Sequence, residues 1–380
     1  MRAEQGTRAT RRPRLAVFAI TALGLVVAGC GAPLAGGGSG GGPGKSAPEP
    51  AAPQYGDGGG LVGGAGFAEG SSLLWGSDAE LAARLDGIAA SGAGYVRVDV
   101  DWSVAQPGPS TWNWGPIDRV VHAIRARGLD VLGLITYTPT WARPAGTPDK
   151  NPPNNPADFA NFSRAAVQRY LPLGVRSWEI WNEPNSQWFW SPKPDAARYT
   201  TLLKQAYAAI KAVDPAATVM TGGFSPAPDA PDGSMIAPVT FLQRVYAAGG
   251  KGHFDAVAHH PYNYPYMPLK PEPNYNWNAF GGVTPMLHQT MVDNGDGEKK
   301  IWGTEMGAPT VDGVTPEYVA EYVAEAFAAW ESWSYTGPLF WYSYRDAGTD
   351  PNDREDNFGL VKVDGTPKEP ALTAFKNAAG

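Results

Sequence analysis

The segment Ser177-Trp-Glu-Ile-Trp-Asn-Glu-Pro-Asn185 joins a short apolar run to an abrupt polar end. Its first five residues are typical of a buried β-strand. Because a proline disfavours helical backbone angles at the residue before it, we expect an extended backbone at Glu183. The segment therefore predicts a strand that presents the carboxylate of Glu183 at its carboxyl end.

A second segment of this kind is Lys300-Ile-Trp-Gly-Thr-Glu305, which also ends in a glutamate. Glu183 and Glu305 would thus each lie at the carboxyl end of a separate strand. A retaining glycosidase needs two carboxyl groups, one as proton donor and one as nucleophile, on opposite sides of a sugar linkage. The two glutamates are therefore candidates for a catalytic pair.

From residue 61 onward, short apolar runs alternate with amphipathic stretches, which is typical of a parallel α/β sheet. The predicted strands are 62–67, 95–100, 130–136, 177–181, 218–221, 256–260, 300–304 and 338–342. The predicted helices lie near 78–91, 116–128, 156–171, 195–213, 238–249, 281–294, 315–334 and 367–378. Eight strand–helix pairs predict a single (β/α)8 TIM barrel. An open doubly wound sheet is the alternative, but the Gly63–Gly66 segment lacks the spacing of a phosphate loop.

The first 30 residues resemble a bacterial signal peptide with a lipobox. A basic start is followed by an apolar run, 15–28, that ends in Val27-Ala28-Gly29-Cys30. We expect Cys30 to be lipidated, with an ordinary secretory signal as the alternative. Residues 31–60 are rich in Gly, Pro and Ala and predict a flexible linker. The catalytic domain would then span 61–380.

Composition narrows the partners and the location. The net charge is −7, and no basic cluster follows the signal, which argues against nucleic acid as a partner. With one cysteine, the chain forms no intramolecular disulfide. We expect an exported monomer, anchored by lipid to the outer face of the cell membrane or envelope, or else secreted.

Four motifs carry a family resemblance. They are Glu179-Ile-Trp-Asn-Glu-Pro-Asn185, His260-Pro-Tyr262, Thr304-Glu-Met-Gly307 and Trp341-Tyr342, which end predicted strands four, six, seven and eight. Together they resemble clan A glycoside hydrolases, in particular cellulase-like and β-xylosidase-like enzymes of families 39 and 5. The resemblance covers 61–380.

The resemblance implies a role for each matching residue. Glu183 corresponds to the acid/base and Glu305 to the nucleophile, while Asn182 corresponds to the residue that binds the sugar 2-hydroxyl. Arg97 and Tyr262 correspond to groups that hold the nucleophile, and His260 to the histidine of strand six. Trp341 resembles the platform beneath the reacting sugar. No cofactor or metal is expected.

Further aromatic residues are candidates for sugar binding, because an aromatic face packs against the C–H face of a pyranose. Trp141 follows strand three, and Trp188 follows the Glu183 motif. Tyr264, Tyr266, Tyr275 and Trp277 lie on a long proline-rich segment after strand six, and loops of that length are often functional. This row of aromatics favours endo action on a polymer.

Several local alternatives remain open in the sequence. Arg97 could pair with Glu179, deeper in the barrel, instead of Glu305. Period two places Asp99 and Asp101 on the same strand face as Arg97, where they could bind substrate, water or Arg97 itself. Of the adjacent histidines we favour His260 for the site. A metal site from both histidines and Asp255 is disfavoured, because no further ligand has useful spacing.

We therefore expect a retaining β-glycosidase that cleaves a polysaccharide or oligosaccharide by double displacement. The alternative from another class is a non-catalytic carbohydrate-binding lipoprotein built on the same barrel. An inverting hydrolase is a further alternative, which the separation of the carboxyl groups distinguishes: about 5–5.5 Å for retention and wider for inversion.

Overall fold

The computed structural model describes residues 64–271 and 278–380. The signal segment, the lipobox with Cys30 and the linker 31–60 lie outside the described residues, as do Tyr275 and Trp277. No helix in the described part of the chain is long and apolar enough to cross a membrane.

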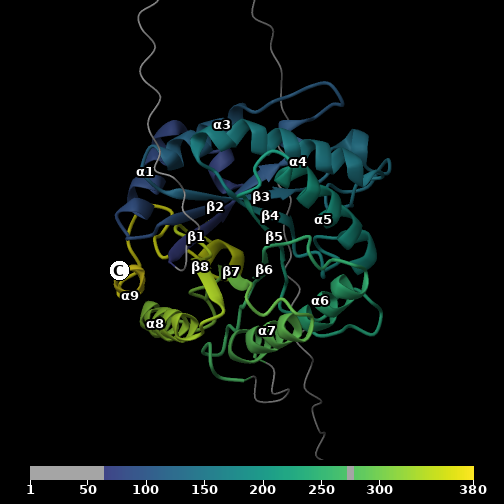
Figure 1. Cartoon of the computed structure of the whole chain (residues 1–380). Helices are drawn as coiled ribbons and strands as arrows, with labels where there is room; N and C mark the ends of the chain where they lie inside the picture. Colours follow the sequence, from purple (N-terminus) through teal and green to yellow (C-terminus); the bar gives the residue numbers. More distant parts are fainter. Residues whose placement is uncertain (1–63, 272–277) are drawn as a thin grey trace, which may run out of the picture. The chain divides into compact units, whose positions relative to one another are not determined.

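Eight parallel strands form a closed barrel in sequence order, and β1 pairs with both β2 and β8 (Figure 1). The strands are β1 Ala65–Gly70, β2 Tyr95–Asp101, β3 Asp130–Thr136, β4 Ser177–Asn182, β5 Thr218–Gly223, β6 Ala256–His259, β7 Lys300–Met306 and β8 Thr336–Trp341. The predicted (β/α)8 barrel is confirmed, and each predicted strand boundary agrees within three residues.

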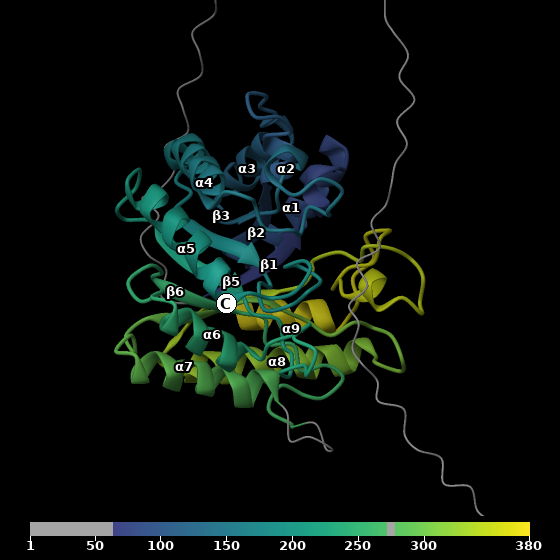
Figure 2. The same cartoon turned by 90° about the vertical axis from the view of Figure 1, so that its right-hand side faces the viewer.

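Helices surround the barrel (Figures 1 and 2). They are α1 Asp78–Ala89, α2 Trp102–Ala105, α3 Gly115–Arg125, α4 Pro156–Tyr170, α5 Ala196–Lys211, α6 Pro238–Ala247, α7 Thr284–Asp293, α8 Pro316–Ser332 and α9 Ala371–Ala379. Short helical turns occur at Ser72–Leu74, Thr140–Ala142, Leu171–Leu173, Ala279–Val283 and Arg354–Asn357. The eight predicted helices are present, and the four-residue α2 directly after β2 was not predicted.

Local sequence signals explain where several helices begin. Ser77 caps α1 in a capping box with Glu80, so backbone N–H groups at the helix start find acceptors. Asn155 and Thr315 cap α4 and α8, each followed by a proline in the first turn. Proline is favoured there because its missing N–H would have had no partner within the helix.

The alternation of side chains along the strands separates two environments. Val96, Val98 and Val100 face outward into the core between strands and helices. The barrel interior holds a smaller apolar cluster: Ala68, Tyr95, Leu132, Met220, Ala256, Ala258, Trp302 and Phe340. Towards the carboxyl ends of the strands this interior becomes polar, with Arg97 and Glu179 both buried. This is the end at which TIM barrels carry their active sites.

Candidate active site

Glu183 leaves β4 in an unusual backbone conformation. Its φ is 42°, and that of Trp181 is 73°, so both lie in the left-handed region rather than the extended one. The predicted extended backbone at Glu183 is therefore wrong. Tertiary hydrogen bonds hold the turn, because the Glu183 N–H donates to the Gly223 carbonyl at 3.1 Å and the Ser186 N–H donates to the Glu183 carbonyl at 3.0 Å. Strained backbone of this kind is characteristic of functional sites.

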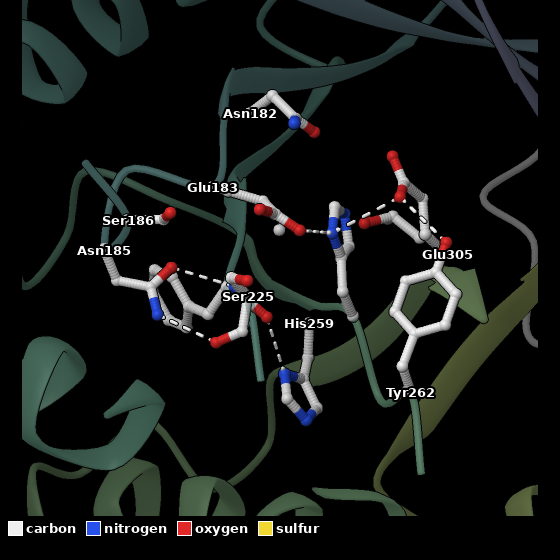
Figure 3. A network of polar contacts seen from close by, with 12 residues as sticks. Asn182, Glu183, Asn185, Ser186, Ser225, His259, Tyr262 and Glu305 are labelled. Atoms are coloured by element: carbon white, nitrogen blue, oxygen red, sulfur yellow. Dashed lines mark hydrogen bonds and ion pairs between the residues drawn. The ribbon is translucent and has the colours of Figure 1, made fainter. Parts of the chain in front are cut away.

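Glu183 and Glu305 approach each other across the end of the barrel (Figure 3). One carboxylate oxygen from each of Glu183 and Glu305 and one ring nitrogen of His260 all lie within 4.8 Å of one another. His260 Nδ1 lies 2.9 Å from Glu183 Oε1 and 3.6 Å from Glu305 Oε2. The Glu183 side chain is 4% exposed and that of Glu305 is 16% exposed, so the pair is buried but Glu305 stays open to solvent.

Arg97 links Glu179, deeper in the barrel, with Glu305. Its guanidinium donates to Glu179 at 2.6 and 3.1 Å, to Glu305 Oε1 at 2.5 Å and to Asn182 Oδ1 at 2.9 Å. Arg97 therefore makes both ion pairs that the sequence left as alternatives. The Tyr262 hydroxyl donates to Glu305 Oε2 at 3.0 Å, so both oxygens of Glu305 are held.

These contacts shift the pKa values of Glu305 and His260. Burial alone would raise the pKa of Glu305, but His260, Arg97 and the Tyr262 hydroxyl lower that pKa below its ordinary value. Burial alone would likewise lower the pKa of His260, but Glu305 and Glu183 raise it above its ordinary value. The site thus favours an ionised Glu305 beside a proton-donating imidazole.

The neighbouring His259 points away from the pair. Its ring nitrogens lie 3.1 Å from the carbonyls of Phe224 and Ala279, and burial lowers its pKa to about 4, so it is neutral at physiological pH. Asp255 precedes β6, whereas the histidines lie at its carboxyl end, and Asp255 bonds Tyr207 and the Val219 N–H. The disfavoured alternative of a metal held by these three residues has no basis in the described structure.

The cluster of Glu183, His260 and Glu305 has donor atoms close enough for a metal ion. However, the Arg97 guanidinium lies 2.5 Å from one of these carboxylates, and its positive charge opposes a cation at the same oxygen. The donor set therefore fits acid–base chemistry better than metal binding.

The structure corrects the position of the aromatic platform. Trp341 is fully buried among the helix-facing residues, where its indole N–H donates to the Phe358 carbonyl at 3.3 Å, so its faces are closed to a sugar. The pairing of β7 with β8 shifts register twice, and Phe340 and Tyr342 face the interior instead. Burial is the main reason why the pKa of Tyr342 is raised, and the negative charge of the nearby Glu305 raises it further.

The other predicted aromatics and Asn182 have distinct environments. Trp141 is partly buried and donates to the Gln106 carbonyl at 2.9 Å, with its ring edge-on to Trp102. Trp188 is 44% exposed and remains available to a ligand. Asn182 is buried beside Arg97, and its amide nitrogen makes no hydrogen bond with the described residues.

Sequence reasoning assigned no site role to Gly223 or to Tyr342, although Tyr342 belongs to the Trp341-Tyr342 motif. The Gly223 N–H donates to Glu179 Oε1 at 2.7 Å, and its carbonyl accepts from Glu183. A Cβ at this position would overlap the His260 ring. For Gly223, the only signal in the sequence was the pair Gly222-Gly223 at a strand end. Such glycines indicate that another group approaches the backbone closely, but they do not identify that group.

A closed (β/α)8 barrel with two glutamates at the ends of β4 and β7 defines a clan A glycoside hydrolase. Residues 62–337 match the family model of cellulase, glycosyl hydrolase family 5. The chain belongs to this family. No curated protein sequence gives a significant match.

Solved structures with the same fold come from families 39 and 5. A family 39 glycoside hydrolase from Bacteroides cellulosilyticus WH2 has a TM-score of 0.67 and 26% identity over 83% of this chain and 63% of its own. A β-xylosidase from Caulobacter crescentus CB15 has a TM-score of 0.63 and 19% identity over 84% and 68%. An exo-β-1,4-mannosidase from Opitutaceae bacterium strain TAV5 has a TM-score of 0.60 and 18% identity over 84% and 59%. The chain thus spans less than two thirds of two of these enzymes.

Proposed function

We propose that the protein is a retaining β-glycosidase that hydrolyses a polysaccharide or oligosaccharide. The observation that supports this most is the approach of Glu183 and Glu305, whose nearest oxygens lie within 4.8 Å. An inverting enzyme places a water between its carboxyl groups and separates them by about 6.5–9.5 Å. The short approach favours direct attack by one carboxylate.

In the proposed mechanism, Glu305 attacks the anomeric carbon while Glu183 protonates the departing oxygen. A glycosyl–Glu305 ester forms and the C–O bond to the leaving group breaks. Glu183 then deprotonates a water that displaces Glu305, which regenerates both groups. Arg97 and Tyr262 keep Glu305 ionised for the first step, and His260 orients the carboxyl of Glu183 through its 2.9 Å contact. No cofactor takes part.

Endo action on a polymer is the second element of this proposal. Trp188 lies five residues beyond Glu183 in the chain and is 44% exposed, so its ring is open to solvent and could pack against a further sugar unit of a polymer. The mannosidase among the similar structures is described as exo-acting, so product size is decisive. Incubation with a panel of xylan, mannan and β-glucan should release oligosaccharides first; monosaccharide as the sole early product would refute endo action.

The nucleophile assignment is tested by Glu305→Gln, which is nearly isosteric. We expect a loss of turnover on an aryl β-glycoside of at least about 1,000-fold, with the fold retained by circular dichroism. Glu321→Gln on the exposed surface of α8 is the matched control and should be neutral. In Glu183→Ala, azide should restore release from an activated substrate. Wild-type turnover by Glu305→Gln would exclude Glu305, and a binding-only lipoprotein predicts no turnover in any variant.

We also propose that lipidation at Cys30 anchors the protein to the outer face of the cell membrane. The lipobox 27–30 supports this, since more than one acyl chain gives stable anchoring where a single chain is marginal. The linker 31–60 would give the barrel a reach of roughly 30 Å. Cys30→Ala should move the protein from the membrane fraction to the soluble fraction with unchanged activity. An unmodified, fully soluble wild-type protein by mass spectrometry would favour a plain secretory signal.

A further inference from the structure

Asp99 lies on β2 beside the catalytic pair but takes no part in the network described above. It sits two residues from Arg97 on the same strand face, opposite Leu134 of β3 in the sheet register. On its other side its Oδ1 is close to Gly70 at the end of β1, where an added Cβ would lie 3.9 Å away. The side chain is therefore directed into the barrel end between β1 and β3.

The Asp99 carboxylate is buried and lacks a partner. The residue is 5% exposed, and it makes no hydrogen bond or ion pair with any of the described residues. Its potential partners are engaged elsewhere, since Arg97 bonds Glu179, Glu305 and Asn182. Carboxylates in buried residues are normally hydrogen-bonded, because removing a charge from water without a compensating partner is unfavourable.

Asp101, two residues further along β2, provides a contrast. Its Oδ1 accepts from the Ser103 N–H at 2.7 Å, the Ser103 hydroxyl at 2.6 Å and the Val104 N–H at 3.3 Å, which caps α2. Asp101 is thus satisfied by the protein, although it shares the strand face of Asp99. Proximity to the barrel end alone does not leave a carboxylate unpaired.

The charged state of Asp99 is correspondingly unfavourable. Burial, reinforced by the negative charges of Asp101 and Glu305, raises the pKa of Asp99 to about 7, although Arg97 and Lys150 act in the opposite direction. Lys150 is paired with Asp149 at 3.0 Å. The protein therefore pays a cost in stability to keep this group, which is typical of residues retained for a ligand.

The neighbours of Asp99 belong to the substrate end of the barrel. Its charge contributes to raising the pKa of Tyr137 at the end of β3 and of Tyr342 after β8, in both cases after burial. The negative charge of Glu305, the proposed nucleophile on β7, in turn helps to raise the pKa of Asp99. Asp99 consequently shares one space with groups from three other strands around the reacting centre.

Building on the proposed function, we propose that Asp99 is a specificity-determining residue for the sugar bound at Glu305. Each of its carboxylate oxygens can accept a hydrogen bond from a ring hydroxyl, and a glycone carries several such donors. Asn182, on the β4 side, would serve the hydroxyl next to the anomeric carbon. Asp99, on the β2 side, would then bind hydroxyls further around the ring.

The test compares one 4-nitrophenyl β-glycoside, the best substrate of the wild type in a panel, with its 3-deoxy and 4-deoxy analogues. A site built to bind a hydroxyl rejects the analogue that lacks it, so wild-type kcat/KM should fall at least about 100-fold for one analogue. Asp99→Leu, of similar volume, should lower kcat/KM for the parent by a comparable factor and bring the deoxy-to-parent ratio close to one. Asp99→Asn should recover part of the discrimination, because an amide oxygen still accepts.

Asp101→Asn is the matched control. It removes the same charge from the same strand face, and asparagine caps a helix as well as aspartate does, so the deoxy-to-parent ratio should stay at the wild-type value. An active wild type whose discrimination survives in a folded Asp99→Leu variant would overturn the assignment of Asp99 alone. A wild type that cleaves no glycoside or polysaccharide would overturn the proposed function and this inference together.

Discussion

Gly223, the last residue of β5, approaches three residues of the candidate active site: Glu179, Glu183 and His260. Its N–H donates to Glu179, its carbonyl accepts from Glu183, and its missing side chain makes room for the His260 ring. An added Cβ would also lie 2.7 Å from Thr304 Oγ1, on the neighbouring side of the barrel. A residue without functional groups therefore sets the position of the imidazole that orients Glu183.

Gly223→Ala should consequently displace His260 and weaken its contact with Glu183. We expect kcat on an aryl β-glycoside to fall at least about 10-fold, since small misplacements of catalytic groups are costly. The matched control is Gly94→Ala, where an added Cβ meets nothing within 4 Å. Equal kinetics for the two variants would contradict this role.

At the scale of elements, a single lysine joins the segments that follow β7 and β8. Lys368 Nζ donates to Thr310 Oγ1 at 2.8 Å, Asp346 Oδ1 at 2.7 Å and the Asn357 carbonyl at 3.0 Å. Both partners of the ion pair are at most 5% exposed. Since β7 carries Glu305 and β8 leads into Tyr342, this contact stabilises two of the segments that border the site.

Lys368→Met should therefore destabilise the barrel. It leaves Asp346 buried without its cation, and breaking a buried ion pair from one side costs about 3–5 kcal/mol. Chemical denaturation gives the change in the free energy of unfolding. Lys362→Met, at an exposed lysine nearby, is the control and should stay within about 0.5 kcal/mol of the wild type. A loss for Lys368→Met as small as the control's would show that the contact is incidental.

At the scale of the whole molecule, the buried Asp99 carboxylate lowers the stability of the folded protein at neutral pH. The pKa of Asp99 is raised from 3.8 to about 7, so the folded protein holds this proton more tightly than the unfolded chain does. Between those values stability falls as the pH rises, because the folded state binds more protons than the unfolded state. The full cost is present above the folded pKa and absent below the unfolded one.

Asp99→Asn removes this dependence. Relative to the wild type, the variant should gain more stability near pH 8 than near pH 4, by up to a few kcal/mol. Denaturation curves of both proteins at the two pH values measure the difference. A gain that is equal at both pH values would show that the buried carboxylate is not responsible.

Much of the fold was predictable because its signals are local. Eight alternating strand and helix patterns are enough to specify the barrel, and start signals such as Ser77 and Thr315 place helix ends. The alternation of side chains along β2 predicted that Arg97 faces the barrel interior and that the valines face outward, and the structure agrees. A barrel brings strand ends together, so glutamates at the ends of β4 and β7 were expected to meet, and they do.

The sequence by itself thus determined the barrel, the strand faces of β2 and the meeting of the two glutamates, since these follow from periodicity and topology. Only the tertiary structure decided the left-handed turn at Glu183, which depends on a hydrogen bond to Gly223 of another strand. It also decided that Tyr342 and not Trp341 faces the interior, because shifts in the β7–β8 register set which face each residue takes. The sequence left open whether Arg97 pairs with Glu179 or with Glu305. It pairs with both, because packing brings the two carboxylates within reach of one guanidinium.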